Sequence, residues 1–169
     1  MRTLIAEQET LAEIADDKLN SQVDPGVVKS AFYEENLEKL RGIHHSQCLF
    51  NRETSIIPGL RFWFADSGVL QGQFNCSEFQ QGYDTMVHGG VIAAIIDSSM
   101  AQCLMGHGIV GYTIDLAVKY RKPVIISQLA TLTTEITGVN CNVLYSMKCK
   151  IVQSHNLVVQ ATGRFYKVK

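Results

Sequence analysis

Residues 88–106 read HGGVIAAIIDSSMAQCLMG, and this stretch decides the fold of the chain. On a helix its apolar side chains would lie on every side rather than along one stripe. A helix of that kind must be wrapped by other structure. Gly89 and Gly90 precede the apolar run, and Gly106 follows it as a residue that commonly ends helices. We therefore predict a buried helix over about 90–105.

Strand-like segments lie on both sides of this helix. Before it, an alternating run beginning at Leu60 turns at 66–68 into a second run through Phe74, which predicts a β-hairpin. After it, four runs are separated by turn signals at Pro123, at Gly138-Val139-Asn140 and at Ser154-His155-Asn156. We expect strands over about 111–122, 127–137, 142–153 and 156–168.

The predicted order is thus a hairpin, one buried helix and a four-strand meander. Strands joined by short turns pair antiparallel. A sheet that must bury a single apolar helix curls around it, which gives an α+β class with a curved antiparallel sheet.

Residues 1–45 precede this unit. Loosely helical spacing predicts an amphipathic helix up to about Leu19, and a second helix begins at Pro25 and ends near Arg41. We interpret 1–45 as a helical extension and 46–169 as the domain.

Composition limits the class of protein. A chain of 169 residues holds one domain, and 46% hydrophobic against 18% charged residues is typical of globular proteins. No apolar run reaches the roughly 20 residues of a membrane span, and the amino terminus lacks a secretory signal, so we expect a cytoplasmic protein without membrane contact. Five cysteines without CxxC spacing indicate neither a disulfide framework nor a zinc site, and no cofactor is expected.

Charge is distributed unevenly along the chain. Residues 1–45 hold five Lys or Arg against nine Asp or Glu, whereas residues 111–169 hold eight against two. The basic carboxy-terminal part is too weakly charged for nucleic acid. It would suit a small polyphosphorylated ligand, although a solvated face explains the charge equally well.

Asp97 lies in the middle of the apolar helix. Burying an unpartnered carboxylate is costly, so this acid must be partnered, protonated or facing a polar cleft. Partial desolvation raises a carboxyl pKa, which suits a general base. The alternative is a structural acid bonded to Ser98, to Ser99 or to a neighbouring strand.

The turn His88-Gly89-Gly90 opens the same helix. Backbone N–H groups there lack partners within the helix, and two glycines let a ligand approach the backbone closely. Such a turn can hold the oxygen of a polarised carbonyl, with His88 orienting the loop or the ligand. A plain glycine-rich helix entry is the alternative.

The combined pattern resembles a known family. Residues 79–97, FQQGYDTMVHGGVIAAIID, look like the signature of hotdog thioesterases of the phenylacetic-acid-degradation type, within the 4-hydroxybenzoyl-CoA thioesterase superfamily. The likeness continues through 113–124, TIDLAVKYRKPV, and in the entry segments 48–50 and 59–61. It covers roughly residues 46–168 and implies a hotdog fold and hydrolysis of acyl-CoA.

The resemblance also implies roles for single residues. Asp97 would activate water or attack the thioester, the Gly90 N–H would bind the thioester oxygen with His88 supporting the turn, and Thr113 would help to hold the water. Many relatives carry Asn six residues before the histidine, where this chain has Gly82. The function of that Asn is either missing from this chain or supplied by Asp84 or Gln81.

Several other residues are candidates for substrate contact or were weighed against it. Arg121 and Lys122 would meet the CoA phosphates, although strand-end charges are commonly just exposed. Gly89 and Met100 would lie along the substrate, with the acyl group either medium-chain or aryl. We interpret His44, His45, His107 and His155 as surface or loop residues and Cys103 as packing.

Three functions compete at this point. The first is an acyl-CoA thioesterase, and the second is a non-catalytic module that binds or senses acyl-CoA. Asp97 and Thr113 favour the enzyme, because binding alone needs no base. A hotdog dehydratase ranks third, because such enzymes lack the spacing from the HGG turn to the aspartate.

Helix geometry predicts that each site is shared between two chains. Gly90 and Asp97 differ by 97 − 90 = 7 positions, which at about 1.5 Å a residue separates them by roughly 10 Å. Both must lie within about 3 Å of one thioester. We therefore expect a homodimer with antiparallel helices, or a dimer of such dimers as a homotetramer.

Overall fold

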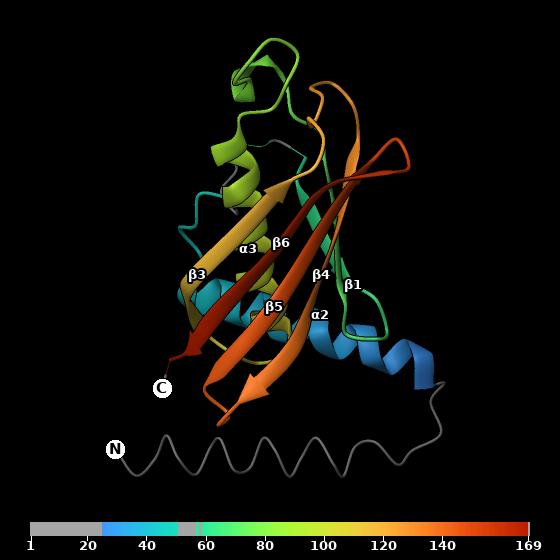
Figure 1. Ribbon diagram of the computed structural model, residues 1–169. Coiled ribbons are helices and arrows are strands. Elements are labelled where there is room, and N and C mark those ends of the chain that lie inside the picture. The colour runs from blue at the N-terminus through green and yellow to red at the C-terminus, as the bar shows by residue number, and fades with distance from the viewer. Residues whose placement is uncertain (1–24, 51–56, 58, 169) are drawn as a thin grey trace, which may run out of the picture.

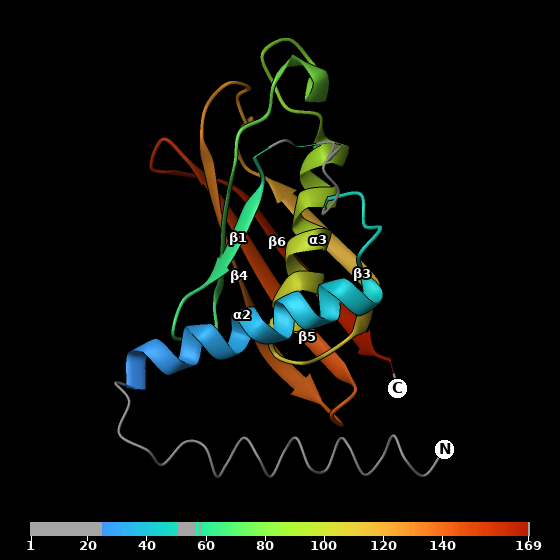
Figure 2. The same cartoon turned by 180° about the vertical axis from the view of Figure 1, so that it is seen from behind.

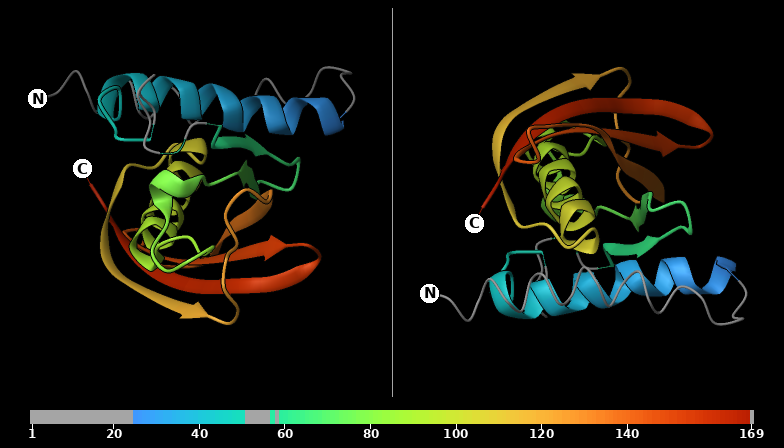
Figure 3. Two further views of the ribbon diagram at one scale, coloured as in Figure 1. Left: turned by 90° about the horizontal axis from the view of Figure 1, so that it is seen from above. Right: turned by 90° about the horizontal axis from the view of Figure 1, so that it is seen from below.

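A six-stranded antiparallel sheet curves around the long helix in the computed structural model, which describes residues 25–50, 57 and 59–168 (Figures 1 and 3). The elements, in chain order, are α2 (Pro25–His44), β1 (Arg61–Phe64), β2 (Leu70–Phe74), the 3₁₀ turn η2 (Glu78–Gln80), α3 (Gly89–Gly106), β3 (Gly111–Tyr120), β4 (Ala130–Asn140), β5 (Leu144–Gln153) and β6 (Asn156–Lys167). The predicted α+β class with a curved sheet around one apolar helix is confirmed.

The core lies between α3 and the concave face of the sheet. Side chains from α3 are fully buried there, and alternating residues of β2, β4, β5 and β6 complete the cluster because successive strand residues face opposite sides. Large side chains that are fully buried in this cluster include Leu70, Phe74, Ile92, Ile95, Ile96, Met100, Leu104, Leu132 and Phe165. By length and composition alone α3 would pass for a membrane span, but 61% of it is buried inside this fold.

Gly106 has a different role from the one its position predicts. It is the last residue of α3, and the C-cap is His107, with φ −84°. A Cβ on Gly106 would lie 2.1 Å from the ring of Phe64. The expectation of a glycine C-cap is therefore wrong in detail, since Gly106 is required for the close approach of β1 to the helix.

The order of strands corrects the predicted meander. The sheet runs β1-β2-β4-β5-β6-β3, so only β4, β5 and β6 follow one another as a meander. β3 pairs with β6 at the far edge. The connection from β3 to β4 is not a tight turn because Val124 is buried and the Val87 N–H donates to its carbonyl at 2.8 Å. Local turn signals do not report such distant pairing.

Helix α2 crosses the carboxy-terminal end of α3, as Figure 2 shows from behind. Leu37 is fully buried, and the Asn36 side chain donates to the Gly106 carbonyl at 3.2 Å. The ring of Tyr33 stacks on Phe64 with centroids 5.2 Å apart. The predicted second helix is confirmed and runs three residues past Arg41, to His44. The helix expected up to Leu19 lies outside the described residues.

Candidate active site

Asp97 and Thr113 face each other across the gap between α3 and β3. The Thr113 hydroxyl donates to the Asp97 carboxylate, with Oγ1 and Oδ1 2.6 Å apart. Asp97 is only half-buried although its helix is the core helix. The structural alternatives on its own helix do not apply, because Ser98 accepts from Gln102 and Ser99 bonds to the Ile96 carbonyl and to Thr134. The acid is therefore partnered by a hydroxyl from the neighbouring strand, which is the third arrangement named for a structural acid.

A β-bulge between Thr113 and Asp115 aims these side chains in opposite directions. Thr113 is opposite the buried Phe165, so it faces α3, whereas Asp115 is opposite Arg164 on the outer face. In an unbroken strand residues two apart share a face. The extra residue of the bulge breaks that rule. Thr113 is thus brought to Asp97 while Asp115 is kept away from it.

His88 is the N-cap of α3 and supports the turn directly. The Nδ1 of its imidazole accepts from the Gly90 N–H at 3.0 Å, and the backbone N–H of His88 donates to the Gln80 carbonyl at 2.8 Å. The Gly90 N–H, which the sequence singles out as an oxyanion donor, therefore donates to His88 in this structure. A carbonyl oxygen would have to replace the imidazole nitrogen there.

Gly82 explains part of the departure from the usual family pattern. A Cβ at this position would lie 2.9 Å from the His88 Cα. The Gly82 N–H donates to the Met86 carbonyl at 2.9 Å, which closes the loop in front of the turn. An asparagine here would force the loop away from His88, so Gly82 shapes the turn. Asp84 and Gln81 are exposed on the same loop.

The two halves of the site lie apart on one straight helix. Gly90 is in the first turn of α3 and Asp97 is seven residues later, about 10 Å along the axis. Between them Ala93 and Ala94 remain partly exposed. The chain thus brings Asp97 together with Thr113, and His88 with Gly90, but does not bring these two pairs together.

His45 is a residue near the site that sequence reasoning set aside. Burial is the largest cause that lowers its pKa, followed by repulsion from His44 and Arg41, and the charge of Asp97 opposes the shift. The segment after α2 therefore lies close enough to Asp97 to feel its charge. The only signal in the sequence was a histidine pair directly after a helix.

The expected substrate contacts fall into two groups. Arg121 and Lys122 are exposed just beyond β3, where they donate to Gln160 at 3.0 Å and Asn156 at 2.7 Å. They lie at the same end of the fold as the glycine turn, because the preceding residue, Tyr120, contacts Gly89. Met100, in contrast, is fully buried under β6 and belongs to the core.

The cysteine thiols of the core are poor nucleophiles. Burial raises the pKa of Cys103 to about 12 and that of Cys76 to about 11. A thiolate is the reactive form, so neither side chain supplies covalent chemistry near neutral pH. Within the described part of the chain, no three His, Cys, Asp or Glu side chains gather as metal ligands would.

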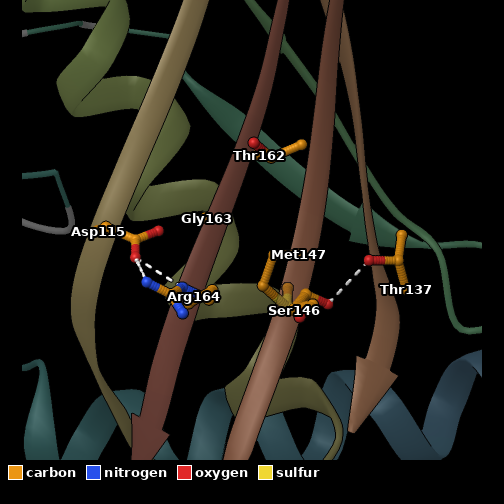
Figure 4. Close-up of a pocket in the computed structure, with 7 residues that line it drawn as sticks. All are labelled: Asp115, Thr137, Ser146, Met147, Thr162, Gly163 and Arg164. Atoms are coloured by element: carbon orange, nitrogen blue, oxygen red, sulfur yellow. Dashed lines mark hydrogen bonds and ion pairs between the residues drawn. The ribbon is translucent and has the colours of Figure 1, made fainter.

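A shallow depression of about 340 Å³ lies on the outer face of the sheet (Figure 4). It crosses four strands and is lined by Asp115, Thr137, Ser146, Met147, Thr162, Gly163 and Arg164. Arg164 forms an ion pair with Asp115. The sheet separates this depression from Asp97, so it is not part of the candidate active site.

Comparison with known proteins confirms the resemblance seen in the sequence. The thioesterase superfamily matches over residues 85–146. The chain is 32% identical over 90 residues to the acyl-coenzyme A thioesterase THEM4 of Rattus norvegicus and 30% identical to that of Mus musculus. Each match covers 52% of this chain and 38% of the relative, so the chain spans well under half the length of these relatives.

Solved structures confirm the hotdog fold. The PaaI protein of the Escherichia coli phenylacetic acid degradation operon has a TM-score of 0.69 at 13% identity, covering 83% of this chain and 96% of PaaI. Mouse thioesterase superfamily member 2 has a TM-score of 0.64 at 16% identity, with coverages of 81% and 97%. A hypothetical thioesterase of Streptococcus pneumoniae, solved with coenzyme A, has a TM-score of 0.62 at 16% identity, with coverages of 66% and 90%.

Proposed function

We propose that this hotdog chain, whose residues 85–146 match the thioesterase superfamily, hydrolyses an acyl-CoA to a free acid and CoA. The observation that carries the proposal is the hydrogen bond from Thr113 to Asp97. It fixes one carboxylate oxygen, Oδ1, and leaves the other for a water or a thioester carbon. A half-buried carboxylate on an apolar helix is suited both to activate water and to attack the thioester carbon.

The chemistry follows from these positions. As a general base, Asp97 would take a proton from water while the oxygen attacks the thioester carbon, and the C–S bond would then break to release CoA thiolate. As a nucleophile, Asp97 would attack the thioester carbon and form an acyl anhydride as the C–S bond breaks and CoA thiolate leaves, and water would then open the anhydride to the free acid and the Asp97 carboxylate. In both routes negative charge develops on the thioester oxygen, which the Gly90 N–H would receive in place of His88 Nδ1.

Two further structures of the S. pneumoniae thioesterase carry substitutions that correspond in type and spacing to Asp97 and Thr113. One replaces an aspartate by alanine and the other a threonine, at positions 16 apart in that chain. Asp97 and Thr113 have the same separation, 113 − 97 = 16. The match in residue type and spacing is an additional reason to propose that Asp97 and Thr113 act together.

We further propose a homodimer in which each site takes Asp97 from one chain and Gly90 from the other. Among the described strands, β3 is an edge strand that pairs only with β6. Its free edge carries exposed apolar side chains, Tyr112 at 69% and Ile114 at 52%. Two such edges paired antiparallel would bury this surface and set the two α3 helices side by side.

A hydrolysis screen tests the proposal. Short, medium, long and aryl acyl-CoAs would be incubated with the chain, and release of CoA thiol would be measured. We expect turnover of at least one class that is lost in Asp97→Asn. Tight acyl-CoA binding without turnover of any class would favour the alternative, a module that binds or senses acyl-CoA.

The basic end of β3 supports acyl-CoA as the ligand. Arg121 and Lys122 lie next to the glycine turn and are exposed, so they would meet the phosphates of a CoA whose thioester lies at Gly90. Replacing both residues by Gln would raise KM and leave kcat nearly unchanged, because they would touch only the remote part of the substrate.

A further inference from the structure

A hydrogen bond joins the last residue of β3 to the first residue of α3. The Tyr120 hydroxyl donates to the Gly89 carbonyl, with the two oxygens 2.7 Å apart. Tyr120 lies opposite the buried Val159 on β6, so its side chain is on the inner side of the sheet. Figure 1 shows β3 ending beside the beginning of α3.

The contacted carbonyl belongs to the peptide unit that carries the Gly90 N–H. The Gly89 carbonyl and the Gly90 N–H are two ends of one planar amide, so holding the oxygen also fixes the direction of the hydrogen. Both flanking residues are glycines, which have the widest backbone freedom. An external contact at this carbonyl therefore adds to the restraint that the helix's own bond supplies in its first turn.

We propose that Tyr120 is a positioning residue for the oxyanion donor: its hydroxyl holds the Gly89–Gly90 peptide so that the Gly90 N–H points to the thioester oxygen. This role rests on the proposed function. It gives a role to Tyr120, to which the resemblance assigns none.

The contact from Tyr120 would remain with a thioester in the site. The amide is held at both ends, by Tyr120 at the Gly89 oxygen and by His88 Nδ1 at the Gly90 N–H. A thioester oxygen would displace only His88. Tyr120 would continue to hold the oxygen end, and a hydrogen bond at a carbonyl polarises the amide and strengthens its N–H as a donor.

Tyr120 is equipped to remain a donor. A phenol keeps its proton throughout the neutral range, and partial burial raises the pKa of Tyr120 further. The carbonyl of Gly89 has two lone pairs, of which the helix uses one for its own i to i+4 bond. The second is free for Tyr120.

Tyr120→Phe removes the hydroxyl and keeps the ring, so it tests the hydrogen bond separately from the packing. Ring carbon atoms of Tyr120 come within 3.7 Å of where a Gly89 Cβ would stand, and phenylalanine keeps that packing. We expect kcat to fall about tenfold, less than for outright loss of an oxyanion donor, while KM stays within about twofold. Tyr166→Phe is the matched control, since Tyr166 lies on the neighbouring strand β6, is 50% exposed and faces the outer side of the sheet.

A second readout does not depend on turnover. In an NMR spectrum of the ¹⁵N-labelled chain, the Gly90 amide resonance should shift and its hydrogen exchange should accelerate in Tyr120→Phe but not in Tyr166→Phe. An unchanged Gly90 amide, or a raised KM with normal kcat, would overturn the positioning role. A wild-type chain that hydrolyses no acyl-CoA would instead refute the proposed function, while the amide measurement still decides whether Tyr120 holds the peptide.

Discussion

Two carboxylates lie near the same bulge of β3 and differ in their partners. On the outer face Asp115 accepts from the Arg164 Nε at 2.6 Å, and both side chains are half exposed. On the inner side Asp97 accepts from the Thr113 hydroxyl, also at 2.6 Å. The first carboxylate has a cation to balance it, whereas the second is held by a neutral group. The two acids thus differ in what holds them, an ion pair for Asp115 and a neutral hydroxyl for Asp97.

The largest expected effect is the difference in kcat between variants of Asp97 and of Asp115. Asp97→Asn should lower kcat at least about a hundredfold, because amide nitrogen and oxygen cannot serve as base or nucleophile. Asp115→Asn should leave kcat unchanged. Both rates would be measured on the best acyl-CoA of the screen, with dimer content checked by light scattering. Near-normal turnover by Asp97→Asn would remove Asp97 from the mechanism.

A smaller loss is expected when the hydroxyl is removed. Thr113→Ala frees the Asp97 carboxylate to rotate but leaves it able to act, so kcat should fall less than in Asp97→Ala, by about tenfold. Thr162→Ala, on the outer face opposite Ala117, is the control and should have normal kinetics. Damage from Thr113→Ala equal to that from Asp97→Ala, in a folded chain, would mean that Thr113 itself does the chemistry.

His45 should give the fold a mild dependence on pH. Its pKa is lowered in the folded chain by burial, so below the unfolded value of about 6.5 the unfolded chain takes up the proton more readily. Stability should therefore be full above about pH 6.5 and fall as the pH drops through that value toward the folded pKa. Urea unfolding at two pH values, one on each side, should show a smaller difference in His45→Gln.

The pKa of His45 also depends on the charge of Asp97. The Asp97 charge opposes the lowering, so Asp97→Asn should lower the pKa of His45 further. An NMR titration of the imidazole would measure this. An unchanged pKa would place His45 outside the electrostatic reach of the site.

The smallest effect should come from the outer ion pair. Both partners are solvent-exposed, and exposed ion pairs contribute little to stability. Arg164→Gln should change Tm by about 2 °C or less and leave kinetics unaltered. A calorimetric scan at low and moderate salt would check it, and a large loss of Tm would show that this pair holds the bulge of β3 in place.

Local patterns in the sequence predicted the elements well. The all-round apolar run predicts α3 and its burial, and alternation predicts β4, β5 and β6 to within a few residues. Asp97 could be singled out because a carboxylate in such a helix has few explanations. These features depend on near neighbours in the chain.

What the sequence could not supply depends on distant neighbours. The place of β3 beside β6, the contact of Gly106 with Phe64 and the bond from Tyr120 to Gly89 each join residues far apart in the chain. Periodicity identifies the buried face of an element but not the element that covers it. His45 was missed for the same reason, since nothing in its local context points to Asp97.

The most direct test of the account asks whether Asp97 and Gly90 act in the same site from different chains. Gly90→Pro removes the oxyanion N–H at a position where the first helical turn tolerates proline, and Asp97→Ala removes the acid. Each variant alone should be inactive. Differently tagged chains of the two would be mixed, exchanged and purified as heterodimers, and their hydrolysis of acyl-CoA measured. One site of each heterodimer would then carry both defects and the other none, so activity should recover toward half of the wild-type value per dimer. Verified heterodimers without recovered activity, or a fully active monomer, would contradict the shared site.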